Sequence, residues 1–293
     1  MEDKIFYNQA SSSKLGWTVK DFNCDDYDDD LIKAIKKFQR ENGLKADGLC
    51  GPGTYRRLIA KKESEAETHK RYHAPEKDGN HIICNGHQVP IQWKKVLTYE
   101  DVGGLKLSSG YRRCNNFRDV KYFVNHWDVC LNSETCVKVL RKRGISVHFC
   151  IDNDGTIYQL MDANHIAYHA GSSKWNAASI GVEISNAYYP KYQNWYKKNG
   201  YGERPIWKDK KVHGGKLGDF LGFYDVQLEA AKALWQSIGS FYKIPLIGPK
   251  VVDGVDPDSV KCKFKGIINH YNLKKSKIDC AGLDIENLLK DIK

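Results

Sequence analysis

The sequence lacks both a long apolar run and a recognisable export signal. None of its hydrophobic stretches approaches the ~20 residues that a helix needs to cross a bilayer, so we expect no membrane insertion. The first residues, MEDKIFYNQASSSK, have no apolar core of the kind found in secretory signals. We therefore expect synthesis in the cytoplasm, whatever the later destination of the protein.

The cysteines form no repeating frame and no C-x-x-C pair. Their number is nine, which is odd, and without an export signal such cysteines are more typical of buried thiols or metal ligands than of disulfides. Cys130, Cys136 and Cys150 fall within a predicted helix or strand and are expected to be small core residues. Since no nucleic-acid-binding module is recognisable either, a basic nucleic-acid-binding protein with structural zinc is disfavoured.

The composition is that of a folded and basic protein. A chain of 293 residues has room for one domain of ordinary size and a small one. Hydrophobic residues make up 41%, which is enough for a real core. The net charge of +10 predicts attraction to an anionic partner, but nucleic acid, an acidic membrane surface and a bacterial wall all qualify.

The first part of the chain predicts a small helical domain over residues 1–62. Within residues 28–62, apolar residues recur at helical spacing, Asp30 is the expected N-cap, and Gly43 is expected to end the helix. The stretch GPGT then leads to Thr54 as the expected N-cap of a second helix. Such a helical hairpin is too small to hold an active site of its own.

Residues 63–110 are expected to be a linker and connecting segment. Residues 61–80 are polar and charged, which is typical of a linker. Residues 81–93, HIICNGHQVPIQW, predict a strand and turn that pack on the second domain.

Residues 111–293 alternate between strand and helix patterns. This alternation predicts an α/β domain with a central mixed β-sheet flanked by helices. An aromatic and basic insert, residues 188–216, has three open interpretations: it gates a groove, binds an anionic wall polymer, or is a solvated loop. The expected strands cover 121–129, 178–185, 266–273 and a hairpin around DNDG, and the expected helices cover 133–144 and 225–242.

Two histidines lie where strands are expected to end. His126 follows YFVN and His270 follows GIIN, and the ends of strands are rigid platforms for metal ligands. Catalytic zinc needs three protein ligands and one open position. A loop of nine or ten residues after His270 returns to Asp279 and Cys280, and adjacent residues in an extended segment point opposite ways. We therefore expect a third ligand from one member of this pair.

The chain resembles two known families in these motifs. AIKKFQRENGLKADGLCGPGTYRRL resembles the peptidoglycan-binding repeat that many wall hydrolases carry. FVNHWD, SVHFCIDNDGTIYQL, AYHAGSSKWNAASIGVEI and HYNLKKSKIDCAG occur in the order seen in the zinc-dependent N-acetylmuramoyl-L-alanine amidases of type 2, which include phage lysins and the animal peptidoglycan recognition proteins. This second resemblance covers roughly residues 115–290.

The resemblance implies a bound Zn²⁺ and suggests its ligands. His126 and His270 match the two metal histidines of the family. The stretch DCAG resembles the family's DCPG, with Ala281 in place of proline, and this alignment favours Cys280 as the third ligand. The alternative alignment, on a K-x-D-P pattern, makes Asp279 the ligand.

The resemblance also implies the catalytic groups. In SIGVE, Glu183 matches the glutamate that acts as general base, and the position of the family's alternative tyrosine is Val147 here. Lys277 matches the lysine that stabilises the developing oxyanion, provided that the K-x-D alignment holds.

Three further residues match the segment that lines the family's cleft. They are His169, Trp175 and Asn176, and we expect them to contact sugar or peptide.

The implied function is hydrolysis of peptidoglycan. Zinc-activated water would cleave the amide between N-acetylmuramic acid and the L-alanine of the stem peptide. The expected protein is a phage endolysin, a monomer that acts on the bacterial wall after release from the cytoplasm. Two alternatives stay open: a bacterial autolytic or recycling amidase, and a non-catalytic peptidoglycan receptor, although such receptors characteristically lose the third ligand.

Overall fold

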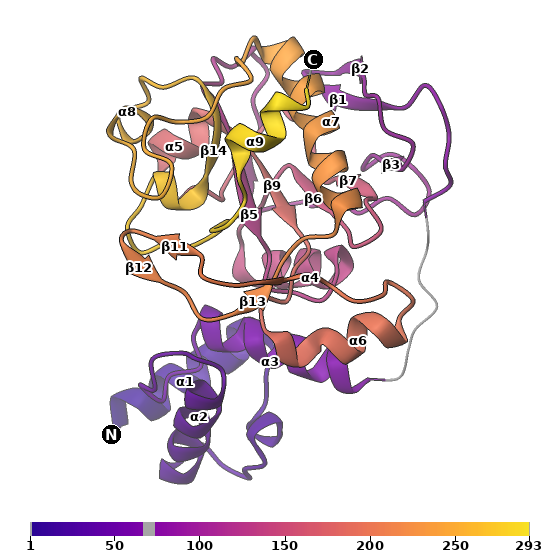
Figure 1. Ribbon diagram of the computed structural model, residues 1–293. Coiled ribbons are helices and arrows are strands. Elements are labelled where there is room, and N and C mark those ends of the chain that lie inside the picture. Colours follow the sequence, from indigo (N-terminus) through magenta and orange to yellow (C-terminus); the bar gives the residue numbers. More distant parts are fainter. Residues whose placement is uncertain (1, 67–73, 293) are drawn as a thin grey trace.

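The computed structural model describes residues 2–66 and 74–292. A helical N-terminal region lies against an α/β domain whose centre is a six-stranded sheet (Figure 1). The predicted mixed sheet with flanking helices and helical N-terminal domain is confirmed. No helix in the described ranges is long and apolar enough to span a membrane.

The N-terminal region consists of α1 (Glu2–Leu15), a 3₁₀ turn (Val19–Phe22), α2 (Asp29–Glu41) and α3 (Pro52–Glu65). Both predicted caps are wrong, although both predicted helices are present. Asp28 caps α2, because its Oδ1 accepts from the backbone N–H groups of Asp30 and Leu31 at 3.0 Å. Gly51 is the N-cap of α3, and the Thr54 hydroxyl instead accepts a hydrogen bond from Gln39 in the buried interior.

The central sheet has the strand order β14-β5-β9-β6-β7-β3. β14, β5, β9 and β6 run parallel, while β6 and β7 form the antiparallel hairpin that the DNDG turn predicts. The strands are β3 (Val96–Leu97), β5 (Tyr122–Trp127), β6 (Phe149–Ile151), β7 (Ile157–Gln159), β9 (Ser179–Ile184) and β14 (Gly266–Asn269).

Helix α7 (Asp225–Tyr242) packs on one face of the sheet and has the predicted bounds. Its buried Trp235 donates a hydrogen bond to Asn125 of β5 at 3.0 Å. The hairpin of β1 (His81–Cys84) and β2 (His87–Pro90) packs against α7, as predicted for residues 81–93. The remaining helices of the α/β domain are α4 (Ser133–Arg143), α5 (Ser173–Ala177), α6 (Gln193–Lys198), α8 (Pro257–Val260) and α9 (Ile285–Lys290).

Helix α4 lies between the sheet and the N-terminal helices (Figure 1). One apolar cluster includes Leu58 of α3, Leu140 of α4 and Cys150 of β6, so the N-terminal region and the α/β domain share a continuous core. The predicted burial of Cys130, Cys136 and Cys150 is confirmed. The linker predicted at 61–80 lies partly outside the described residues, since 67–73 are not described, and α3 itself continues to Glu65.

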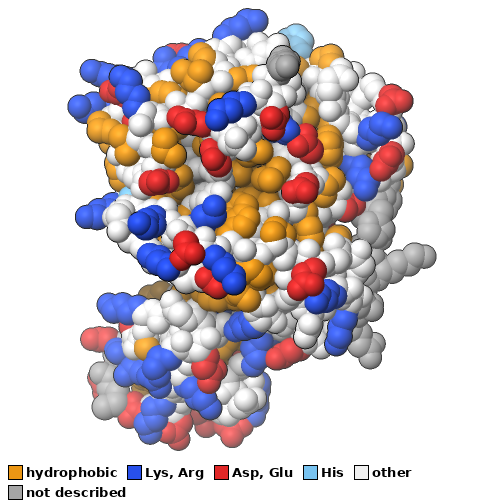
Figure 2. Space-filling model, viewed as in Figure 1, with side chains coloured by type: hydrophobic (Ala, Val, Ile, Leu, Met, Phe, Trp, Pro, Cys, Tyr) orange, Lys and Arg blue, Asp and Glu red, His pale blue; other side chains and the backbone are white. Residues whose placement is uncertain are grey.

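The insert forms short strands beside the sheet. β10 (Ile206–Trp207) pairs with β13 (Phe220–Leu221), and β11 (Lys211–Val212) pairs with β12 (Gly215–Lys216). One further pair joins β4 (Tyr111–Arg112) to β8 (Ile166–Ala167). Figure 2 shows Lys and Arg side chains interspersed with Asp and Glu over the visible face of both parts of the molecule.

Candidate metal and catalytic site

The two predicted metal histidines come from neighbouring parallel strands. His126 is in β5 and His270 directly follows β14, so the register of the two strands brings both side chains to the same end of the sheet. Each is 3% exposed, and their rings lie 4.5 Å apart between centroids. Burial and the neighbouring His270 lower the pKa of His126, which favours the neutral imidazole that a metal requires.

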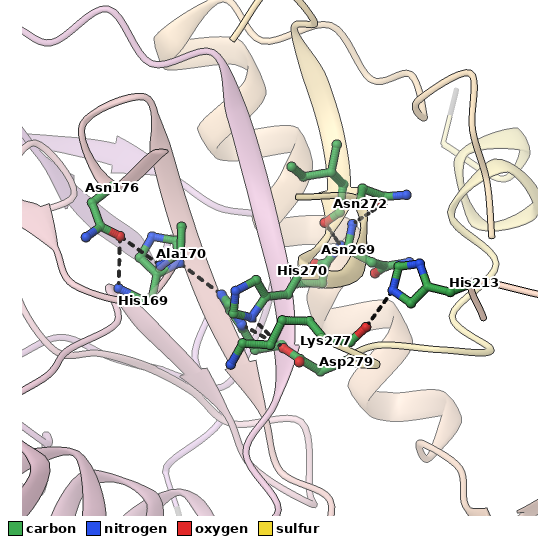
Figure 3. Close-up of polar contacts among 12 residues, drawn as sticks. His169, Ala170, Asn176, His213, Asn269, His270, Asn272, Lys277 and Asp279 are labelled. Carbon is green, nitrogen blue, oxygen red and sulfur yellow. Dashed lines mark hydrogen bonds and ion pairs between the residues drawn. The ribbon is translucent and has the colours of Figure 1, made fainter. Parts of the chain in front are cut away.

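Asp279 completes the cluster (Figure 3). Its Oδ2 lies 2.9 Å from the Nδ1 of His126 and 2.9 Å from the Nδ1 of His270. Burial alone would raise the pKa of Asp279, but His270 and His126 hold it well below the usual range, so the carboxylate is ionised.

The donor set fits zinc. One atom from each of His126, His270 and Asp279 lies within 4.8 Å of the others, and in the described part of the chain no other three His, Cys, Asp or Glu residues do so. Two imidazoles and a carboxylate are a common zinc ligand set in hydrolases. The Nε2 of His270 is also buried and has no hydrogen-bond partner among the described residues.

Cys280, the other candidate for the third ligand, packs in the apolar core. It is fully buried and belongs to the apolar cluster that contains Tyr271, Ala281 and Leu283. Burial raises the pKa of its thiol well above the ordinary value, which keeps the sulfur neutral. The geometry therefore favours the alternative ligand, Asp279, over the preferred Cys280, because the carboxylate meets the histidines while the thiol belongs to the apolar cluster.

His169 contacts His126, one of the two histidines of the cluster. Its Nδ1 lies 2.9 Å from the Nε2 of His126, and its Nε2 lies 3.2 Å from the hydroxyl of Ser179. That hydroxyl donates to the backbone carbonyl of Trp175 at 2.7 Å. The ring packs over Gly181, where an added Cβ would approach the His169 ring to 2.5 Å, so the glycine of SIGVE makes room for it.

This chain of hydrogen bonds allows only one arrangement of protons if the Nδ1 of His126 is free for a metal. Nε2–H of His126 then donates to Nδ1 of His169, whose own Nε2–H donates to Ser179. The Ser179 hydroxyl in turn donates to the Trp175 carbonyl. Burial lowers the pKa of His169 well below its ordinary value, which agrees with the neutral ring that this arrangement requires.

Glu183 stands beside His126 in the sheet. The two residues are direct partners in the parallel β5–β9 pair, so their side chains project from the same face. The Oε2 of Glu183 is buried and has no hydrogen-bond partner in the described ranges, and burial raises the pKa of the carboxyl above its ordinary value. An acceptor held in this way is suited to take up a proton.

Lys277 lies beside the cluster, whereas Asn176 holds a nearby loop. Lys277 is half-buried and lies beside Asp279 and His270 in Figure 3. Asn176 accepts hydrogen bonds from the backbone of His169 and Ala170, which fixes the loop that carries His169.

Trp175 is half-buried, and its indole donates to the carbonyl of Val260 at 3.0 Å. Direct contact of His169, Trp175 or Asn176 with substrate stays a prediction.

Two residues of this neighbourhood, Ser179 and His213, are not among the site residues predicted from the sequence. Ser179 stands at the start of the SIGVE strand, two residues before the glycine, and that spacing alone signals the same face of the strand as Gly181 and Glu183. His213 comes from the insert, and its Nε2 lies 2.8 Å from the backbone carbonyl of Lys277.

Comparisons with known families agree with this geometry. A family described as "N-acetylmuramoyl-L-alanine amidase" matches residues 116–279, more than half of the chain. A family described as "Putative peptidoglycan binding domain" matches residues 13–58. No curated protein matches the chain significantly.

Solved structures of similar proteins include amidases from two bacteria. The amidase AmiD from E. coli is 21% identical over 46% of this chain and 49% of its own, with a TM-score of 0.32. The amidase LysC from Clostridium intestinale URNW is 15% identical over 68% of this chain and 97% of its own, with a TM-score of 0.41. The chain thus spans about half the length of AmiD and nearly all of LysC.

Proposed function

This chain belongs to the N-acetylmuramoyl-L-alanine amidase family, and from that premise we propose that it is a zinc-dependent peptidoglycan amidase. The bond cleaved is the amide between the lactyl group of N-acetylmuramic acid and the L-alanine of the stem peptide. The observation that carries the proposal is the convergence of His126, His270 and Asp279, with Glu183 beside His126 on the neighbouring strand.

The residues proposed to hold zinc are His126 and His270 through Nδ1 and Asp279 through its carboxylate. When bound, zinc supplies Lewis-acid chemistry, which polarises an amide carbonyl and makes water acidic enough to react near neutral pH. His169 holds His126 in the tautomer that leaves Nδ1 free, and Ser179 holds His169 in turn.

Glu183 is the proposed general base and acid. Its carboxylate takes a proton from the attacking water and returns it to the nitrogen of the departing alanine. The burial that raises its pKa brings the carboxyl closer to the pH at which it can do both. Lys277 supplies a positive charge beside the site, where its ammonium group would stabilise the negative charge that develops on the carbonyl oxygen.

The N-terminal helices are proposed to bind peptidoglycan and to keep the enzyme on the wall. Support comes from the match of residues 13–58 to a peptidoglycan-binding family within the same chain as the amidase match. A wall-binding module joined to an amidase suits an endolysin that acts as a monomer on the bacterial wall. A bacterial autolytic or recycling amidase would use the same site.

Digestion of purified peptidoglycan tests the proposal. The zinc-loaded protein should release free alanine amines without new reducing sugar ends, and a chelator should abolish the release until zinc is restored. New reducing ends would indicate a glycosidase. Wall binding without zinc and without released amines would indicate a receptor, and either result would overturn the proposal.

A further inference from the structure

A buried arginine attaches the insert, residues 188–216, to the central six-stranded sheet. The Arg204 side chain is 1% exposed, and its guanidinium donates to the carbonyls of Gly222 at 2.7 Å and Ser185 at 2.8 Å. It also stacks between the rings of Tyr196 and Tyr224, at 4.3 and 4.4 Å from their centroids. Because Ser185 directly follows β9, the root of the insert is fixed to the strand that carries Glu183.

The far end of the insert reaches the segment that carries Lys277 and Asp279. The Trp207 ring packs so closely on Gly282 that an added Cβ at Gly282 would lie 2.7 Å from its Cε3. Beyond Trp207, the hairpin of β11 and β12 turns at His213 and Gly214. His213 Nε2 lies 2.8 Å from the carbonyl oxygen of Lys277, on the side of that residue away from His169 (Figure 3).

His213 is the first residue of the two-residue turn between β11 and β12. Its φ is 53° and that of Gly214 is 76°, so both residues of the two-residue turn adopt the left-handed conformation, for which Asn, Asp and Gly are strongly preferred. Histidine is also among the residues that adopt this conformation more often than most, so the turn tolerates it. Its contact with Lys277 is the interaction that a shorter Asn side chain would not reach.

Both backbone polar groups of Lys277 are hydrogen-bonded. Its N–H donates to the carbonyl of Lys274 at 2.9 Å, and its carbonyl is the acceptor for His213. The backbone N–H of His213 donates to Asp253 at 2.7 Å, which fixes the turn to a second loop. The backbone of Asp279, the proposed zinc ligand, is also fixed, because its carbonyl accepts a hydrogen bond from the N–H of Tyr271 at 3.0 Å.

From these contacts we infer that His213 is a positioning residue of the amidase, which fixes the Lys277 peptide and so aims the Lys277 side chain at the reacting carbonyl. The insert is then a rigid part of the active site. The inference rests on the proposed function for the role of Lys277, but the contact itself does not. Displacement of a catalytic group by about 1 Å can lower a rate by up to about a hundredfold. The loss of one hydrogen bond that positions Lys277 can therefore lower kcat measurably.

Two substitutions of His213 separate the hydrogen bond from the turn. His213→Asn suits the left-handed backbone but is too short to reach Lys277, whereas His213→Gln has an amide N–H at about the distance of Nε2. We expect His213→Asn to lower kcat about tenfold with less than a twofold change in KM and with one zinc per chain retained. His213→Gln should recover kcat to within about threefold of the wild type.

Hydrogen exchange of the zinc-loaded full chain gives a readout that does not depend on activity. Amides of residues 270–284 should exchange several-fold faster in His213→Asn than in the wild type or His213→Gln. The matched control is Lys211→Ala, an exposed position in the same hairpin, which should leave kcat and exchange unchanged.

Equal kcat values for the Asn and Gln variants, unchanged exchange in His213→Asn, or loss of zinc from it would each overturn the inference. If the wild type releases no alanine amines, the proposed function fails, while the exchange comparison still tests the contact.

Discussion

The Nε2 of His126 and the Nδ1 of His169 lie 2.9 Å apart, and this contact joins a proposed zinc ligand to a chain of hydrogen bonds that ends at a backbone carbonyl. The other ring nitrogen of His126, Nδ1, contacts the carboxylate of Asp279, so both nitrogens have a partner. His169, which the sequence predicts to contact substrate, thus hydrogen-bonds a proposed zinc ligand in the structure, and outer partners of zinc sites commonly make such contacts.

Replacement of His169 should weaken zinc binding. We expect His169→Ala to lower zinc affinity about 10–100-fold, because His126 loses the acceptor for its Nε2–H. His169→Asn, whose carbonyl oxygen takes the place of Nδ1, should retain most of the affinity. Competition with a chromogenic chelator measures both, and equal affinities for wild type and His169→Ala would contradict the orienting role.

Alanine substitutions of Asp279 and Cys280, the two candidate third ligands, should have opposite effects on zinc binding. Asp279→Ala is expected to lose bound zinc, because the carboxylate between the two histidines is removed. Cys280→Ala should keep one zinc per chain and lower the free energy of unfolding by about 1 kcal/mol, as expected for a small buried apolar group. Elemental analysis of the purified variants decides, and zinc retained only in Asp279→Ala would restore the preference for Cys280.

Glu183→Gln should separate catalysis from metal binding. The amide is similar in size but cannot accept a proton from water, so kcat is expected to fall about 10²–10⁴-fold while zinc content stays at one per chain. Val182→Ala, a neighbour whose side chain is on the opposite face, serves as the control. A loss of less than about tenfold in Glu183→Gln would assign the base to another group.

Acid should destabilise the fold partly through His148. This side chain is fully buried, its Nδ1 accepts from the N–H of Gly181 at 3.1 Å, and burial lowers its pKa to about 3. The native ring therefore stays neutral while the unfolded ring binds a proton below its ordinary pKa of about 6.5. Stability is fully present above about pH 6.5 and falls as the pH drops towards 3, by at most about 1.4 kcal/mol per pH unit for this group.

Urea unfolding of wild type and His148→Gln between pH 7 and pH 4 checks that slope. The variant should be less stable at pH 7, because the packed ring and its hydrogen bonds are lost, but should lose less stability on acidification. Parallel curves for the two proteins would rule out the contribution of His148.

The N-terminal helices and the α/β domain should unfold together. Their shared apolar cluster includes Leu58 and Leu140, and Glu63 of α3 accepts hydrogen bonds from Asn132 and Thr135 at the start of α4. Calorimetry of the full chain is expected to show one transition. Two transitions separated by several degrees would indicate that the N-terminal helices form an independent module.

The elements predicted correctly from sequence have strong periodic patterns. The bounds of α7 follow from its apolar face, and β5, β9 and the β6–β7 hairpin follow from short apolar runs and turn residues. Helix α1 was missed because it buries only Asn8, Ser12 and Leu15, so its sequence has almost no apolar face. The cap of α2 was misplaced because three consecutive aspartates, residues 28–30, are equally good caps by composition.

The candidate site was predictable only where strands set the direction of a side chain. His126, Glu183 and His270 belong to strands or follow one directly, so register alone brings them together. The choice between Asp279 and Cys280 depends on how a loop twists, and the partners of His169 and His213 come from segments distant in sequence. No local pattern encodes those contacts.

The most direct test of the account is digestion of peptidoglycan by the zinc-loaded protein in ¹⁸O-labelled water, followed by mass spectrometry of the products. Hydrolysis of the lactyl amide places one ¹⁸O in the carboxylate of muramic acid and leaves a stem peptide with a free, unlabelled alanine amine. We predict this labelling, and we expect Glu183→Gln and Asp279→Ala to reduce it greatly. Label at a sugar reducing end, or within the peptide, would contradict it.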